Sequence, residues 1–167
     1  MKGAWPKPEY QIRAVFRAPL PFVFTWCTDI SPIDPQLRRR DFVRKIIEKS
    51  ASRVVYEDLE ESDAGWSWDR NVVTTKPPDR WRLAAVGNHY DTSADYRLSP
   101  LRGGGTRLEL SFRLRPKTSE DELPAKRPLE RDVRKMWRLY AAALERDYRR
   151  TRGTRPSGVQ ASTHAIP

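Results

Sequence analysis

The side chains best suited to acid–base chemistry lie around one histidine. His89 follows Asn88 and precedes Tyr90 and Asp91 near a predicted hairpin, whereas the other histidine, His164, lies close to the C-terminus. An imidazole beside a carboxylate can donate or accept a proton near neutral pH. Histidines are also common in surface turns. The sequence alone therefore leaves two interpretations of His89, a catalytic group or a turn residue.

No motif of an established catalytic class accompanies this histidine. The sequence has no Gly-x-Ser-x-Gly, no phosphate-binding glycine loop and no His-Glu-x-x-His, and Gly103–Gly105 falls in a predicted hairpin. The one cysteine, Cys27, lies among apolar residues and is typical of a small buried side chain. The sequence therefore predicts no metal site and no cofactor.

Strands must position these candidate residues. Between Val43 and Pro116 the apolar pattern has a period of two, and turn residues divide it into strands near 44–50, 53–60, 65–74, 80–87, 91–99 and 105–115. A further strand covers residues 9–17. Such short connections favour antiparallel neighbours.

Helices are predicted on both sides of this strand region. Pro21 begins a short apolar helix, and Asp34 with Pro35 begins a second one that carries Leu37 and ends at Arg38–Arg40. Pro128 begins the longest helix, whose apolar residues recur at helical spacing. Those residues are Leu129, Val133, Met136, Trp137, Tyr140, Leu144 and Tyr148.

Alternation along the strands separates a buried face from a solvated one. The inward residues by this parity are Trp81, Leu83, Ala85, Ala94, Tyr96, Leu98, Leu108, Leu110, Phe112 and Leu114. In strand 65–74, placing Trp66 and Trp68 inside also turns Arg70 inside, where its guanidinium needs an acidic neighbour or a ligand carboxylate. The opposite orientation turns Ser67, Asp69 and Asn71 inward.

The order of these elements resembles the START/Bet v 1-like (SRPBCC) superfamily, and within it the polyketide cyclase/dehydrase and lipid-transport group. The similar segments are Phe16–Phe24, Tyr96–Pro100 followed by Gly105–Leu108, and the closing helix. The resemblance covers residues 9–152, with residues 1–8 as an N-terminal extension and 153–167 as a disordered tail. It implies an α+β helix-grip fold: a curved seven-stranded antiparallel sheet, in the order β-α-α-β6-α, wrapped around the long C-terminal helix.

The resemblance also implies a cavity between sheet and helix. We therefore expect binding or carriage of a small hydrophobic or amphipathic molecule, without covalent chemistry. The expected cavity residues are Trp66, Trp68, Arg70, Trp81, Leu83, Tyr96, Leu110, Phe112, Val133, Met136, Trp137 and Tyr140. One alternative is a cyclase/aromatase-like enzyme in the same cavity, with Arg70, His89, Tyr90 and Tyr140 as its candidate groups.

The excess of basic residues suggests a further alternative, an interaction module that binds nucleic acid or an anionic membrane. The 167 residues include 32 Lys and Arg against 22 Asp and Glu, a formal net charge of +10. Local runs at Arg38–Arg40 and between Arg149 and Arg155 suit nucleic acid or an anionic membrane, although arginines also solvate helix faces. A lone cysteine and the lack of any apolar stretch of bilayer length predict a cytoplasmic protein.

Overall fold

The computed structural model describes residues 5–32, 42–62 and 65–153. The elements are β1 (Tyr10–Phe16), α1 (Leu20–Thr28), β2 (Phe42–Lys49), β3 (Arg53–Ser62), β4 (Gly65–Lys76), β5 (Arg80–Gly87), β6 (Tyr90–Pro100), β7 (Thr106–Pro116) and α2 (Lys126–Gly153). The strands and both of these helices match the predicted segments closely. The second short helix, predicted around Asp34 and Pro35, lies outside the described residues.

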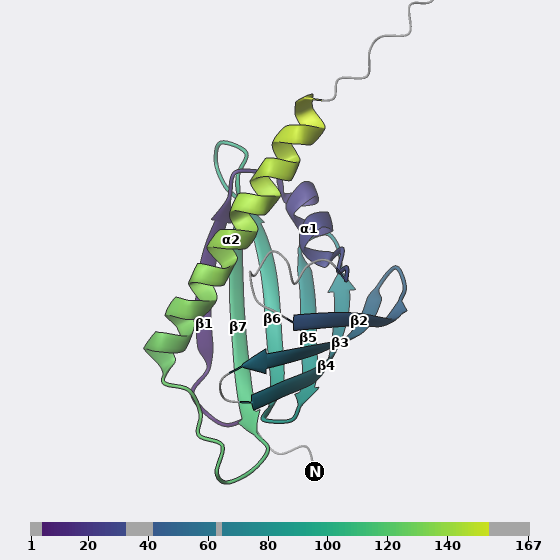
Figure 1. Ribbon diagram of the computed structural model, residues 1–167. Coiled ribbons are helices and arrows are strands. Elements are labelled where there is room, and N and C mark those ends of the chain that lie inside the picture. Colours follow the sequence, from purple (N-terminus) through teal and green to yellow (C-terminus); the bar gives the residue numbers. More distant parts are fainter. Residues whose placement is uncertain (1–4, 33–41, 63–64, 154–167) are drawn as a thin grey trace, which may run out of the picture.

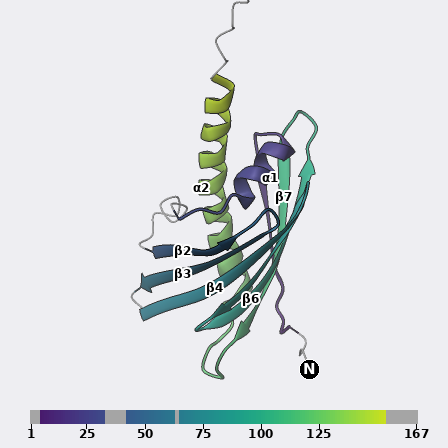
Figure 2. The same cartoon turned by 90° about the vertical axis from the view of Figure 1, so that its right-hand side faces the viewer.

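The strands form one antiparallel sheet of seven in the order β1-β7-β6-β5-β4-β3-β2. Strands β2 to β7 follow one another as a meander, and β1 joins beside β7 with Tyr10 opposite Phe112. The sheet is strongly curved, and α1 and α2 both lie on its concave side (Figure 2). The predicted α+β helix-grip arrangement is therefore confirmed.

Helix α2 lays its apolar residues against the sheet. Trp137 and Leu144 are buried, and Leu129, Val133, Met136, Tyr140 and Tyr148 pack against the same core. The helix begins at Lys126, two residues before Pro128. Proline is tolerated in a first turn because the N–H that it lacks would have no partner within the helix.

Helix α2 runs along the edge strand β1 (Figure 1). Two glutamates of α2 accept hydrogen bonds from backbone N–H groups in β1 and directly after it. The backbone N–H of Gln11 donates to Glu130 Oε1 at 2.7 Å, and the N–H of Arg17 donates to Glu145 Oε1 at 2.9 Å. Amides on a sheet edge are otherwise open to pairing with another chain. The helix therefore covers one edge of the sheet as well as its concave face.

The predicted inward residues of β5, β6 and β7 are confirmed by their burial. Trp81, Ala94, Leu98, Leu108 and Leu110 all belong to the buried core.

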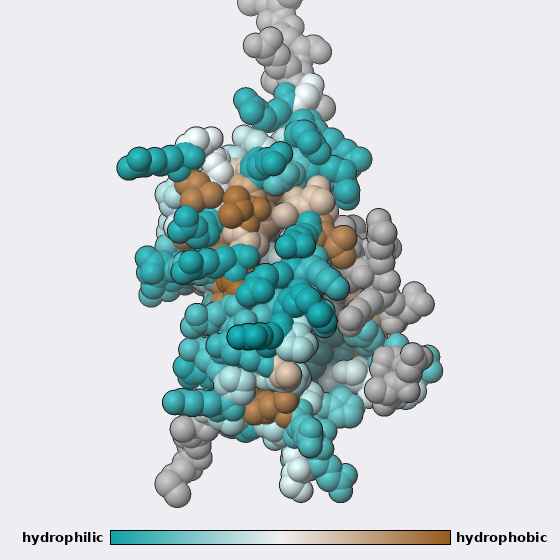
Figure 3. Space-filling view, turned by 90° about the vertical axis from the view of Figure 1, so that its left-hand side faces the viewer, coloured by the Kyte–Doolittle hydropathy of each residue, from teal (hydrophilic) through white to brown (hydrophobic). Residues whose placement is uncertain are grey.

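On the side of β1 and α2, hydrophilic side chains cover most of the surface (Figure 3). No helix in the described ranges has a stretch long and apolar enough to cross a bilayer.

The structure adopts the opposite orientation of β4 to the one that places both tryptophans inside. The row Arg44–Asp58–Asp69 crosses β2, β3 and β4 on the concave face. The neighbouring row Val43–Leu59–Trp68 consequently belongs to the convex face. Ser67, Asp69 and Asn71 of β4 therefore face the concave side.

Candidate ligand-binding site

A cavity of about 700 Å³ lies between the concave face of the sheet and the two helices. Helix α2 contributes Val133, Met136, Trp137 and Tyr140, and α1 contributes Trp26 and Cys27. Strands β2 to β7 form most of the rest of the wall, together with the segment after α1 and the turn between β5 and β6. The inward residues of the strands and the apolar residues of α2 thus line the same cavity.

Aromatic rings in mutual contact form one side of this cavity. Trp81 stacks on Tyr96 with ring centroids 4.8 Å apart, and Tyr96 lies 6.1 Å from Trp137. Trp137 in turn meets Tyr140 edge to face at 5.3 Å. Such rings offer large apolar surfaces with little side-chain freedom, which suits contact with an apolar ligand.

The part of the cavity wall formed by β2, β3 and β4 carries polar and charged side chains. Arg44 forms a bidentate pair with Asp58, with Nε to Oδ1 at 2.8 Å and Nη2 to Oδ2 at 2.7 Å. Their side chains are only 9% and 13% exposed, and the guanidinium lies 4.2 Å from the ring centroid of Tyr56. Beside this pair, Asn71 Nδ2 donates to Asp69 Oδ1. The cavity wall therefore has an aromatic part and a polar part.

Burial determines the protonation of the remaining polar groups in the cavity. It raises the pKa of the Tyr56 and Tyr96 hydroxyls and of the Cys27 thiol well above their usual ranges. The three groups therefore stay neutral across the physiological range. They can donate hydrogen bonds to a ligand, but none is a ready nucleophile.

His89 lies at the border of the cavity, where β5 turns into β6. Its Nδ1 is 3.5 Å from Asp121 Oδ1, and about half of its side chain is exposed. Hydrogen bonds from Thr118, together with His89, lower the pKa of the Asp121 carboxyl. Asn88 fixes the turn, because it accepts from the Trp68 N–H and donates to the Trp66 carbonyl. His89 is therefore accessible and has a carboxylate beside it.

All the predicted cavity residues border this space except two, Trp66 and Arg70. Trp66 is 57% exposed. Arg70 lies on the convex face and meets Glu57, its cross-strand partner, with Nη2 to Oε1 at 2.6 Å. The inclusion of Trp66 and Arg70 among the cavity residues was wrong, because β4 has the second of the two orientations that the sequence left open, and Glu57 pairs with Arg70 outside the cavity. Trp68 borders the cavity at its edge.

Sequence reasoning missed Arg44, Tyr56 and Asp58. The residues Arg44 and Asp58 are equidistant along the chain from Ala51, in the turn between β2 and β3. In the structure a β-bulge between Ile46 and Glu48 shifts the register of the hairpin by one residue, and only this shift places Arg44 opposite Asp58. The pair was missed because it depends on a bulge that the alternating pattern of the strands does not indicate.

The structure describes only part of the two basic runs. Arg149, Arg150 and Arg152 are exposed at the C-terminal end of α2. Arg38–Arg40 and Arg155 lie outside the described residues. Among the described side chains, no three His, Cys, Asp or Glu groups gather in a way that could hold a metal ion.

No family model and no curated protein matches the chain. Solved structures do match. The aromatase/cyclase ZhuI from Streptomyces sp. R1128 is 16% identical, covers 91% of this chain and 99% of its own, and has a TM-score of 0.64. A START superfamily protein from Mycobacterium smegmatis is 14% identical over 86% of this chain and 98% of its own, with a TM-score of 0.60.

The protein Ara h 8.0201 is also similar, at 13% identity over 82% of this chain and 97% of its own, with a TM-score of 0.61. Identities at this level carry information about the fold but not about activity. The topology, the curved sheet and the position of α2 agree with these matches. The chain therefore has the helix-grip fold of the START/Bet v 1-like superfamily.

Proposed function

We propose that the protein binds or carries a small amphipathic molecule in the cavity beneath α2. The observation that carries this proposal is one space of about 700 Å³ that is lined both by aromatic rings and by the Arg44–Asp58 pair. Ligand pockets commonly measure about 300–1,000 Å³ and combine apolar walls with a few polar groups. A ligand with an apolar body and one polar end matches both parts of the wall.

The energetics favour such a ligand over a purely apolar one. Burial of apolar ligand surface against Trp81, Tyr96 and Trp137 contributes about 25 cal/mol per Å² before the costs of association. Close to Arg44 and Asp58, an apolar group would displace water without replacing its hydrogen bonds. A hydroxyl or carbonyl at that end of the ligand would replace them.

Native mass spectrometry of freshly purified protein tests this proposal first. We expect an added mass that is released on denaturation and can be extracted and identified. A protein that carries no such mass from several expression hosts, and that binds none of a panel of amphipathic probes, would contradict the proposal.

Two matched variants locate the binding. Met136 borders the cavity, whereas Leu139, on the same helix, is a large exposed apolar residue. Met136→Trp is expected to fill part of the cavity. It should lower the binding affinity for an environment-sensitive fluorescent probe about ten-fold or more, equivalent to about 1.4 kcal/mol. Leu139→Trp, which adds the same indole outside the cavity, should leave the probe affinity unchanged.

A second candidate function is catalysis in the same cavity. The observations that favour it are the two possible proton-transfer residues at the cavity wall, His89 and Tyr140, and the aromatase/cyclase ZhuI among the similar structures. Incubation with a linear polyketone, followed by mass spectrometry for loss of water, tests it. Turnover should fall in His89→Ala or Tyr140→Phe while binding persists, and equal turnover in both variants and the wild type would contradict an enzymatic role.

A further inference from the structure

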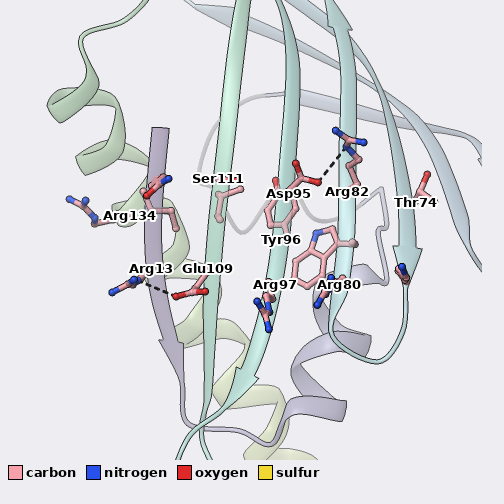
Figure 4. Close-up of a pocket in the computed structure, with 15 residues that line it drawn as sticks. Arg13, Thr74, Arg80, Arg82, Asp95, Tyr96, Arg97, Glu109, Ser111 and Arg134 are labelled. Carbon is pink, nitrogen blue, oxygen red and sulfur yellow. Dashed lines mark ion pairs between the residues drawn. The ribbon is translucent and has the colours of Figure 1, made fainter. Parts of the chain in front are cut away.

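The convex face of the sheet carries a second hollow, which has Trp81, Tyr96 and Leu110 in common with the cavity on the other face. It measures about 1050 Å³ and extends across strands β1, β7, β6, β5 and β4 (Figure 4). Six basic side chains line it against two acidic ones. The groove therefore has a net positive charge, and it lies on a different face from the cationic end of α2.

Both acidic residues of the groove are already paired. Glu109 Oε1 lies 3.3 Å from Arg13 Nε, and Asp95 Oδ1 lies 3.4 Å from Arg82 Nε, as the dashed lines in Figure 4 show. In each pair the two residues are directly opposite each other on neighbouring strands. These carboxylates are thus engaged by their own arginines.

Of the other four cations, Arg134 on α2 pairs with Glu130 at 3.6 Å, and the remaining three occupy consecutive positions of one row. Lys76 is opposite Arg80, and Arg80 is opposite Arg97, across β4, β5 and β6. Within the described ranges no ion pair is found for Lys76 or Arg97, and Arg80 reaches only its neighbour Asp79, at 3.8 Å. In Figure 4 the side chains of Arg80 and Arg97 lie next to each other.

Such a row is unfavourable for the protein by itself. Like charges directly opposite each other destabilise a sheet. Strands are about 4.8 Å apart, so three cations occupy a span of about 10 Å. A multiply charged anion placed across the row would turn this repulsion into attraction.

We propose that Lys76, Arg80 and Arg97 form a binding site for a compact ligand that bears phosphate groups, of the diphosphate type. A carboxylate brings one negative charge, whereas each phosphate monoester brings about 1.5 to 2 at neutral pH. The planar guanidinium groups can also form bidentate hydrogen bonds to phosphate oxygens. The site is independent of the cavity ligand, since it uses the opposite face of the same strands.

Calorimetric titration with inorganic pyrophosphate tests the site. We expect one saturable site per chain, with affinity reduced about ten-fold by Arg97→Gln or Arg80→Gln, as befits the loss of a charge-assisted hydrogen bond. The matched control is Arg113→Gln, which removes one positive charge from the same face of the sheet outside the groove, where Arg113 pairs with Glu9 at 3.0 Å. This control should keep pyrophosphate affinity within about two-fold.

Loss of binding must be separated from loss of folding. Arg97 is directly opposite Arg80 on one side and Glu109 on the other. Arg97→Gln therefore removes one repulsion and one attraction, and its thermal midpoint without ligand should stay close to that of the wild type. Three results would overturn the proposal: no binding of pyrophosphate by the wild type, an equal loss in Arg113→Gln, or equal affinity for citrate, a tricarboxylate of similar charge.

Two arms distinguish the source of the phosphate. Phosphatidylcholine vesicles with and without phosphatidylinositol 4,5-bisphosphate report on a lipid headgroup. Binding to the phosphorylated vesicles that is lost in Arg97→Gln would support the site with a headgroup as its ligand. Binding of pyrophosphate without vesicle binding would support the site with a soluble phosphate ligand.

Discussion

Arg44 and Asp58 each depend on the other within the cavity. Removal of one partner leaves a poorly solvated charge, because both side chains are largely buried. Arg44→Met is therefore expected to lower the free energy of unfolding by about 3–5 kcal/mol, measured by urea denaturation. The double variant Arg44→Met, Asp58→Leu should regain most of this loss, since neither charge remains.

The double variant also tests whether Arg44 and Asp58 recognise a ligand, separately from their effect on stability. If the two side chains recognise the polar end of a ligand, the double variant should fold well yet no longer distinguish 1-hydroxypyrene from pyrene, two probes with the same ring system. A double variant as unstable as Arg44→Met would show that the pair contributes packing that apolar side chains cannot replace. Retained discrimination between the probes would remove Arg44 and Asp58 from the recognition of the ligand.

At the scale of elements, the contact between α2 and β1 depends on single carboxylate oxygens. Glu130 is 8% exposed and accepts the Gln11 N–H. Glu130→Ala leaves that amide without its partner and should cost about 1–3 kcal/mol of unfolding free energy. Glu130→Gln keeps a carbonyl acceptor and should lose less, and amide hydrogen exchange at Gln11 should accelerate only in the alanine variant. Equal losses in both variants would contradict this role.

Elements differ in how well the sequence predicts them, and β7 and β4 illustrate why. In β7 the inward residues after Thr106 are apolar and the outward ones from Arg107 to Arg115 are polar or charged, so the strand's own pattern fixes its orientation. In β4 both faces mix apolar and polar residues, and the two tryptophans lie on the face opposite the cavity, so the pattern of this strand alone does not fix its orientation. Cavity residues on β5, β6, β7 and α2 were therefore predictable. The polar residues of the cavity depend on which residues pair across neighbouring strands. The sequence pattern of a single strand does not predict those pairs.

For the whole molecule, one sheet serves two chemically different surfaces. Along β5 and β6, Trp81 and Tyr96 point into the cavity while Arg80, Arg82 and Arg97 line the outer groove. Alternation of side chains along a strand makes this separation possible without additional elements. Substitutions in the groove should consequently leave cavity binding unchanged, and the Met136→Trp variant should bind pyrophosphate as the wild type does.

Burial of neutral phenols also makes the stability of the whole molecule sensitive to alkali. Tyr96 has an ordinary pKa of 10.0, which burial raises in the folded state. A group whose pKa is raised by folding contributes stability that is complete below its unfolded value and declines as the pH rises toward its folded value. The thermal midpoint should therefore fall as the pH rises above 10.0. Tyr96→Phe should fall less steeply, and an identical decline in the two proteins would show that Tyr96 ionises freely in the folded state.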